Sequence, residues 1–367
     1  MVTATSAEIS RRRARDRNHP KIQNGQNSAI NHAVRLIHAV CGLAGSPNLI
    51  EEIRAELGAE KIRAAIRNRD TGPVFDWLMA AVSYQGVSDQ VAYTYMEKHG
   101  RATWQQIERG FDRASCPKLR SYWHFHDCRY DKVSRTCAEP DHISRCPLPK
   151  HDLRNGRLNQ TAYSLFLFIR DIADGDLVGW IDQQLQDGNH PVGPDGLARM
   201  RANLIEPLRE VYGVSDKVLT MALSSILLGA PKRMSLWIEV GGSMIAIVTL
   251  VHNFLHRTGI LRRFETEHGY GAACYRHNGC AEVLAVVAQQ IDARQFNPTF
   301  PKTFARFVQH AIWAYCSQSG LDVCNGNRID DSKRCANMDC IIRLMCDRVV
   351  LRRSFKQPRQ RSRNLSP

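Results

Sequence analysis

Four cysteines gather near the C-terminal end of the sequence, with the spacing C-x10-C-x4-C-x5-C. They are Cys324, Cys335, Cys340 and Cys346. Thiolates are soft ligands, and a group of them in an intracellular protein usually binds zinc or an iron–sulfur cluster. Reduced cysteines with a structural role are the alternative. Cys316 is a spare candidate ligand, although its position in a predicted helix favours the hydrophobic core.

Residues 114–152 contain a second group of possible ligands and little helical periodicity, so we interpret them as an inserted loop module. Its cysteines are Cys116, Cys128, Cys137 and Cys146, and four histidines interleave with them. The spacing matches no C-x2-C knuckle, so a metal site (zinc or a second cluster) and a loosely packed insertion both remain open. Tyr122, Trp123 and Phe125 either stack on nucleic-acid bases or pack the insertion onto the helices.

Two further cysteines, Cys274 and Cys280, bracket a short polar segment. Two thiols do not complete a metal site, and His268 and His277 are possible additions. We therefore expect a structural role for this pair of cysteines. Cys41 stands alone on an apolar helical face, which predicts a place in the core.

A glycine-containing turn precedes a strongly apolar helical stretch, and the sequence of residues 211–217 is V-Y-G-V-S-D-K. The backbone N–H groups of a helix that begins after such a turn suit a phosphate. Lys217 lies just inside this helix, where an amine half-buried by apolar neighbours can act as a nucleophile. A solvated lysine at an ordinary helix start is the alternative.

This segment resembles the hairpin of the helix–hairpin–helix DNA glycosylases, the endonuclease III superfamily, whose pattern is L-P-G-V-G-x-K; Ser215 replaces the second glycine. Other stretches resemble the family in the same order, namely 75–78, 83–89, 153–172 and 245–259. The resemblance covers residues 73–113 and 152–346. It implies a mainly α, two-lobed helical fold with a C-terminal iron–sulfur loop and a Cys/His-rich insertion.

The resemblance also implies roles for single residues. Lys217 matches the catalytic lysine, whose amine attacks C1′, forms a Schiff base and allows strand cleavage by β-elimination. Gln85 matches the residue that enters the duplex where the target nucleotide is flipped out. The hairpin residues that would meet DNA are Gly213, Val214 and Ser215. The family's catalytic aspartate falls on Val248, which cannot stabilise positive charge on the sugar; Asp216 or Glu239 could substitute only through a favourable geometry.

The C-terminal cysteines occupy the place of the family's iron–sulfur loop, C-x6-C-x2-C-x5-C, and their last spacing matches. The resemblance therefore favours a [4Fe-4S] cluster with a structural role over zinc. Three basic residues in this loop, Arg328, Lys333 and Arg334, could contact phosphate. Asp330 and Asp331 beside them count against that interpretation.

The formal net charge is +14, and residues 1–22 and 348–367 carry +4 and +7 of it. Basic arms favour a polyanion, most often nucleic acid, while solubilising tails are the alternative. We expect DNA as the partner, a monomer, and no membrane association, because no apolar run approaches a bilayer span. No apolar stretch follows the N-terminal arginines, so we expect an intracellular protein, cytoplasmic, nucleoid-associated or nuclear.

Helical periodicity dominates the sequence, and alternating strand patterns are scarce, which predicts a mainly α protein. We expect a loop over 229–242 and a continuous helix over 244–257. The predicted segments are a disordered basic arm (1–27), N-terminal helices with the first part of a helical barrel (28–113), the insertion (114–152), the barrel with hairpin and return helices (153–315), the Cys-rich loop (316–346) and a disordered basic tail (347–367).

Three functions remain open at this point. The first is DNA repair by base excision, as a DNA glycosylase or abasic-site lyase, and Lys217 favours it. The second is DNA binding or damage sensing by a catalytically impaired protein of the same fold, and Val248 favours it. The third is an unrelated α-helical metal-binding protein with basic arms.

Overall fold

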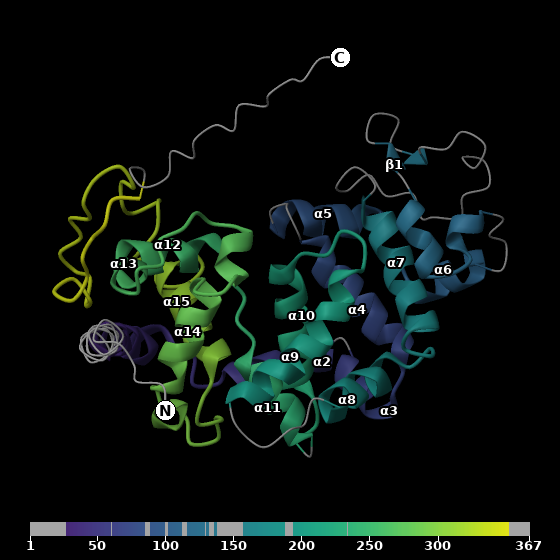
Figure 1. Cartoon of the computed structure of the whole chain (residues 1–367), viewed down its shortest axis with the longest axis horizontal. Coiled ribbons are helices and arrows are strands. Elements are labelled where there is room, and N and C mark those ends of the chain that lie inside the picture. Colours follow the sequence, from purple (N-terminus) through teal and green to yellow (C-terminus); the bar gives the residue numbers. More distant parts are fainter. Residues whose placement is uncertain are drawn as a thin grey trace, which may run out of the picture. The chain divides into compact units, whose positions relative to one another are not determined.

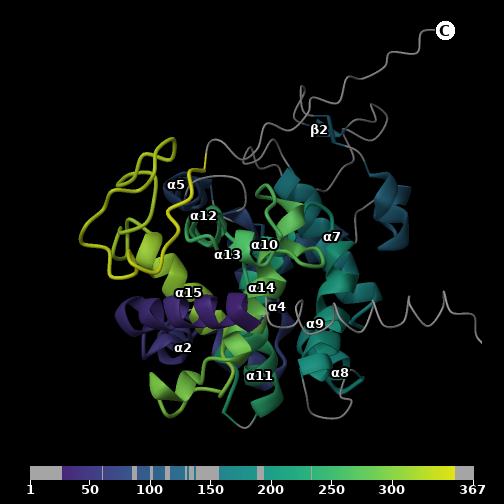
Figure 2. The ribbon, with the colours of Figure 1, turned by 60° about the vertical axis from the view of Figure 1, so that its left-hand side comes forward.

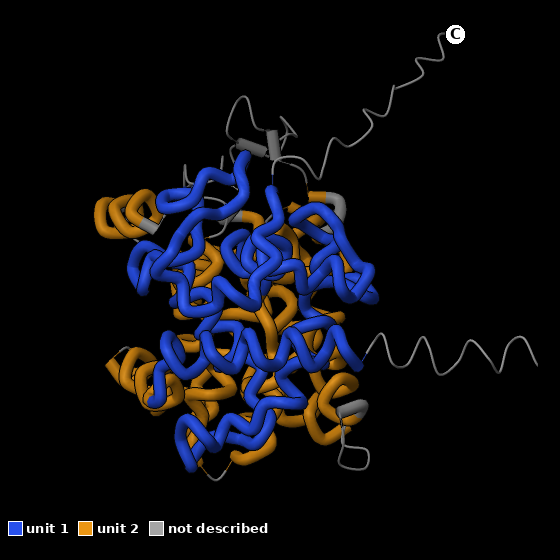
Figure 3. The backbone as a smooth tube through the Cα atoms, turned by 90° about the vertical axis from the view of Figure 1, so that its left-hand side faces the viewer, with its two compact units in different colours: residues 1–47, 247–367 blue, residues 48–246 orange. Residues whose placement is uncertain are grey.

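The computed structural model describes residues 27–59, 61–84, 89–99, 102–111, 116–128, 130–131, 136–137, 157–187, 194–232 and 234–351. The described residues are mainly helical, as predicted (Figure 1). Of the predicted disordered tails, 1–27 and 347–367, only residues 27 and 347–351 are described. Residue 27 begins the N-terminal helix, and the backbone N–H groups of Asp347, Val349 and Leu351 donate hydrogen bonds to the carbonyls of Thr258, Arg257 and Asp331, so the predicted disorder is wrong for these residues. The chain divides into two compact units, formed by residues 48–246 and by residues 1–47 with 247–367 (Figure 3).

The unit formed by residues 48–246 is built on α10 (Asp216–Gly229), the apolar helix that follows the hairpin. α10 packs against α2, α4, α9 and α11 and is buried along most of its length. Gly229 lets α2 approach closely, because a Cβ at this position would lie 2.1 Å from Leu57 Cδ1. The other helices of this unit are α2 (Leu49–Ala59), α3 (Ile62–Asn68), α4 (Thr71–Ser83), α5 (Asp89–His99), α6 (Trp104–Phe111), α7 (Arg157–Asp171), α8 (Leu177–Asp187), α9 (Pro194–Arg209) and α11 (Ser235–Ser243).

The other unit combines an N-terminal helix, Asn27–Ala44, with the C-terminal third of the chain. Its N-terminal helix buries Ala33, Leu36, Ile37 and Val40, which recur at three- and four-residue steps and so lie on one face. The later helices are α12 (Thr249–Arg257), α13 (Ile260–Arg263), α14 (Cys280–Gln289) and α15 (Ala305–Cys316), with the 3-10 turns η5 (Ala272–Tyr275) and η6 (Ala293–Gln295). α15 packs against both α12 and α14.

Two predictions of secondary structure, one of a loop and one of a helix, are wrong around residue 240. The predicted loop over 229–242 contains α11, whose Gly241 packs against α10; a Cβ there would lie 2.7 Å from Leu227 Cβ. The glycines that indicated a loop thus permit close helix packing instead. The predicted helix over 244–257 begins only at Thr249, because residues 244–248 are not helical and the backbone of Met244 and of Val248 is extended.

Residues 116–128 of the predicted insertion are described, and they form two short 3-10 turns, η1 (Pro117–Leu119) and η2 (Trp123–Asp127). Tyr122 packs edge-on against Phe168, and the Phe125 ring stacks with that of Tyr163, so these two aromatic residues anchor the turns on α7. Trp123 is 63% exposed. A two-stranded antiparallel pair, β1 (Tyr130–Asp131) and β2 (Thr136–Cys137), follows.

No single helix in the described part of the chain is long and apolar enough to cross a membrane. The helices Asn27–Ala44 and Leu49–Ala59 reach the required length and apolar character only when they are counted together as one bent pair.

Candidate functional site

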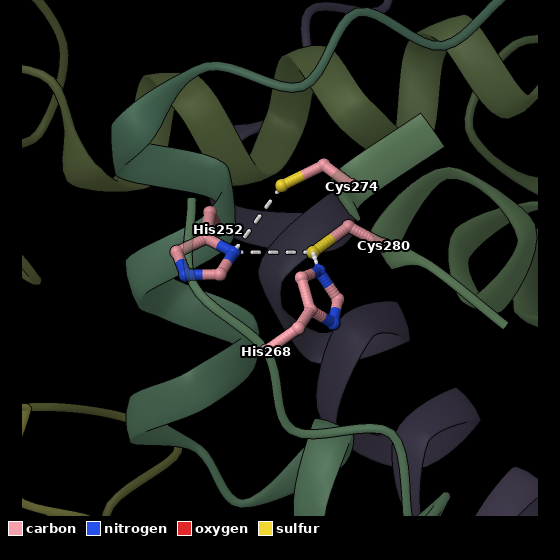
Figure 4. A group of neighbouring side chains, drawn as sticks. All are labelled: His252, His268, Cys274 and Cys280. Atoms are coloured by element: carbon pink, nitrogen blue, oxygen red, sulfur yellow. Dashed lines mark hydrogen bonds between the residues drawn. The ribbon is translucent and has the colours of Figure 1, made fainter. Parts of the chain in front are cut away.

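Two histidines and two cysteines converge in the unit that contains α12 (Figure 4). Their donor atoms all lie within 4.8 Å of one another, and the group is His252, His268, Cys274 and Cys280. His252 Nδ1 lies 3.3 Å from Cys280 Sγ and 3.5 Å from Cys274 Sγ. His268 Nε2 lies 3.2 Å from Cys280 Sγ. This group, which we call the Cys/His centre, can hold a metal ion.

Each ligand of the Cys/His centre comes from a different local element. His252 lies in the first turns of α12, and Cys280 is the first residue of α14. Cys274 lies in η5, and His268 lies in the connection between α13 and η5. The two cysteines and His252 are buried, and His268 is half-buried. The packing of these elements therefore brings together residues that no short motif connects.

The two thiols of the Cys/His centre differ in acidity. The hydrogen bond from Cys280, together with the nearby His252 ring, lowers the pKa of Cys274 to about 4 although burial opposes this. The same hydrogen bond and burial raise the pKa of Cys280. Cys274 is therefore the thiol that ionises first, and a thiolate is the form that binds a metal.

The C-terminal cysteine loop, residues 316–346, lies beside α12 and α15 in both views (Figures 1 and 2). Burial raises the pKa of Cys346 to about 12, and the neighbouring thiols of Cys324, Cys340 and Cys335 add to the shift. The Tyr315 hydroxyl lies 3.1 Å from Cys340 Sγ. The thiols of Cys324, Cys335 and Cys340 therefore lie near that of Cys346.

Arg257, at the end of α12, connects this helix to the C-terminal cysteine loop. Its guanidinium is 3% exposed, donates to Cys324 Sγ at 3.3 Å and forms an ion pair with Asp331. A hydrogen bond from Cys316 and the charge of Arg257 lower the pKa of Cys324 to about 7 despite burial. Cys316 itself is fully buried in α15, so its predicted place in the core is confirmed, and it also contacts the predicted ligand set.

The three basic residues predicted to meet phosphate are all exposed in this loop. Arg328 Nε donates to Asp322 at 2.7 Å, and Lys333 Nζ lies 3.5 Å from Asp330. These acids offset part of the positive charge, as the sequence indicated for Asp330. Arg334 is exposed on the same loop.

Several predicted site residues lie outside the described residues. Gln85 and Cys146 are among them, and the side chain of Cys137 in β2 is not described either. Cys116 is buried, and Cys128 is half-buried, with its carbonyl accepting a hydrogen bond from Gln160 at 3.1 Å. The predicted metal site of the insertion therefore stays a prediction.

The hairpin between α9 and α10 is a tight turn around Gly213, which has a φ of +76°. A Cβ at this position would lie 2.9 Å from Thr161 Oγ1 on α7, so glycine suits both the left-handed backbone and the close approach. Arg209 Nε donates to Asp216 at 2.7 Å, which closes the turn between the two helices. Lys217 follows in the first turn of α10 and is half-buried.

Val248 is the N-cap residue of α12, with a φ of −96° and a ψ of 163°. Its carbonyl accepts the first helical hydrogen bond, from His252 N at 3.0 Å. Asp, Asn, Ser and Thr are the residues that stabilise this position, and valine offers no oxygen to cap the helix. Lys217 and Val248 belong to different units of the chain.

Comparisons with known proteins find no match to this chain among family models, curated proteins or solved structures. The functional interpretation therefore depends on the residues and on their geometry.

Sequence reasoning missed His252 as a ligand and treated Cys274 and Cys280 as structural. His277, considered as an addition to that pair, is instead exposed and lies 3.1 Å from Glu282. The sequence signal for His252 as a ligand was weak, because this residue lies in an apolar helix, 28 positions before Cys280. Such separation hides a metal site whose ligands come from packed helices rather than from one loop.

Proposed function

We propose that the protein binds DNA through the hairpin between α9 and α10 and acts as an abasic-site lyase through Lys217. The observation that carries this proposal is the position of Lys217, half-buried in the first turn of α10 directly after the tight turn at Gly213. A helix N-terminus attracts phosphate, so the turn suits a DNA backbone next to a reactive amine.

An open pocket of about 580 Å³ beside α10 supports a nucleotide-sized substrate. Its lining includes Val218 and Met221 of α10 and three aromatic residues. The aromatic residues are Trp77, Tyr84 and Tyr93. Lys217 is not among the lining residues; it directly precedes Val218 in α10 and lies one helical turn before Met221. Aromatic rings in such a pocket are suited to stack on a base or on an extruded nucleotide.

The proposed reaction needs no carboxylate to expel a base. The neutral amine of Lys217 adds to C1′ of the open-chain abasic aldehyde, and loss of water gives an imine. Transfer of a C2′ proton to water then breaks the C3′–O bond and expels the 3′ phosphate by β-elimination, which breaks the strand. Lys217 is thus the nucleophile, and hydrolysis of the imine releases it.

A second candidate function is DNA binding without chemistry, and Val248 favours it. This residue occupies the position where the resembled family has its carboxylate, and an aliphatic side chain cannot stabilise a developing positive charge. Removal of an intact base is therefore the step that this chain is least equipped to catalyse.

Borohydride trapping on a duplex with one abasic site tests the proposal. The full chain should form a covalent adduct, and Lys217→Ala should lose it while still binding the duplex. Lys232→Ala is a matched control, because Lys232 is an exposed lysine in the same unit. An intact protein that binds DNA with strong salt dependence but forms no adduct would support the second candidate instead.

For the C-terminal cysteine loop, we propose a [4Fe-4S] cluster held by the four predicted cysteines. Support comes from the proximity of the other three thiols to Cys346 and from the buried guanidinium of Arg257 beside Cys324, because a positive charge stabilises thiolates. A cluster of this kind would supply no step of the lyase reaction, and its role would be structural.

A further inference from the structure

We propose that the Cys/His centre binds a zinc ion with a structural role, separate from any metal bound by the C-terminal cysteine loop. The four ligands are His252 Nδ1, His268 Nε2, Cys274 Sγ and Cys280 Sγ. This inference is independent of the lyase activity and depends only on the geometry of one unit of the chain.

The distances between the donor atoms fit tetrahedral zinc. Zinc binds cysteine sulfur at about 2.3 Å and histidine nitrogen at about 2.0–2.1 Å, so neighbouring donors in a tetrahedron lie roughly 3.3–3.8 Å apart. The three separations given above are 3.3, 3.5 and 3.2 Å, and no pair exceeds 4.8 Å. One ion at the centre therefore reaches all four atoms after small movements.

The hydrogen bond of the His268 ring to the backbone also favours a metal. His268 Nδ1 lies 2.6 Å from the carbonyl oxygen of Thr266, and a carbonyl can only accept, so Nδ1 carries the proton. The lone pair on Nε2 then faces Cys280. Histidine ligands of metals typically donate their other N–H to a backbone carbonyl in this way.

The same four residue types could hold a two-iron cluster of the Rieske kind, which places two cysteines on one iron and two histidines on the other. The arrangement here argues against such a division, because His252 lies within 3.5 Å of both sulfurs. A mixed set of two sulfurs and two nitrogens around one point is typical of zinc.

The ion would be structural because all four positions are filled by protein and three of the ligands are buried. No ligand position is left for a water molecule or a substrate. The ion would fix the connection from α13 to α14 against α12, and so would hold the helix whose N-cap is Val248.

The test uses the full chain without a histidine tag, purified without chelator. Elemental analysis should give one zinc per chain, and X-ray absorption at the zinc edge should give two sulfur neighbours at about 2.3 Å and two nitrogen neighbours at about 2.0 Å. Zinc with four sulfur neighbours would place the ion at the C-terminal cysteine loop and overturn the proposal. Protein without zinc, or with iron in this centre, would also overturn it.

Variants provide a second readout. Cys280→Ser should lower the zinc content at least tenfold, whereas Cys41→Ser should retain it, because Cys41 is a buried cysteine of the same unit away from the centre. Unchanged zinc content in folded Cys280→Ser would contradict the proposal. If Cys280→Ser does not fold, the absorption spectrum of the unaltered chain decides the question alone.

Discussion

The Cys/His centre and the C-terminal cysteine loop belong to the same unit and share helix α12, yet they differ in how their ligands are arranged. In the Cys/His centre, the four donor atoms lie within 4.8 Å of one another, whereas the sulfur atoms of the four loop cysteines form no group this compact. A single ion needs close donors, and a four-iron cluster is larger and holds its thiolates further apart. A recognisable spacing and a compact ligand set are therefore separate signs of a metal site.

Removal of one ligand from each region should separate the two sites, and this is the largest expected effect. Cys340→Ser should abolish the brown iron–sulfur absorption and the bound iron while leaving one zinc per chain. Cys280→Ser should do the reverse. The measurements are the visible spectrum and the metal content of the full chain. Loss of both metals from a folded variant of either kind would contradict two separate sites.

Arg257→Met tests the connection between the two regions. The positive charge of the buried Arg257 guanidinium compensates the negative charge of Asp331 and of the Cys324 thiolate. Its removal should therefore lower the free energy of unfolding by roughly 3–5 kcal/mol. Denaturant unfolding measures the change, and metal analysis should show zinc retained and iron reduced. Arg262→Met is the control, because the exposed Arg262–Glu267 pair contributes only about 0–1 kcal/mol. Equal losses in the two variants would contradict a special role for Arg257.

Val248→Asp has the smallest expected effect on stability. An aspartate at the N-cap of α12 should raise the free energy of unfolding by roughly 0.5–2 kcal/mol, because its carboxylate can accept from the first-turn N–H groups. Val248→Thr keeps the shape of the side chain and should give part of this gain. An unchanged free energy of unfolding in Val248→Asp would contradict the N-cap role of this position.

Most of the helices could be predicted from the sequence, because apolar residues at three- and four-residue steps determine which face is buried. The N-terminal helix, with Ala33, Leu36, Ile37 and Val40 on its buried face, is an example. The prediction was wrong for α11, because Gly241 indicates a turn in isolation and close packing in the folded unit.

The candidate site was predictable only in part. Lys217 could be selected because a short turn and a helix start are local features. The Cys/His centre could not, because His252 and Cys280 become neighbours only when α12 and α14 pack in one unit. Tertiary packing of this kind leaves no periodic signal in the chain.

The discontinuity of one unit sets an order of assembly. The helix Asn27–Ala44 is synthesised first, yet the residues that cover it come more than 200 positions later: the rings of His38 and Phe296 lie 5.2 Å apart, and Gly45 contacts Phe307. At about 5–20 residues per second, translation of residues 48–246 alone leaves this helix uncovered for on the order of tens of seconds. The ligands of both candidate metal sites lie in this later part of the chain, between His252 and Cys346, so the metals can enter only after the last ligands have left the ribosome.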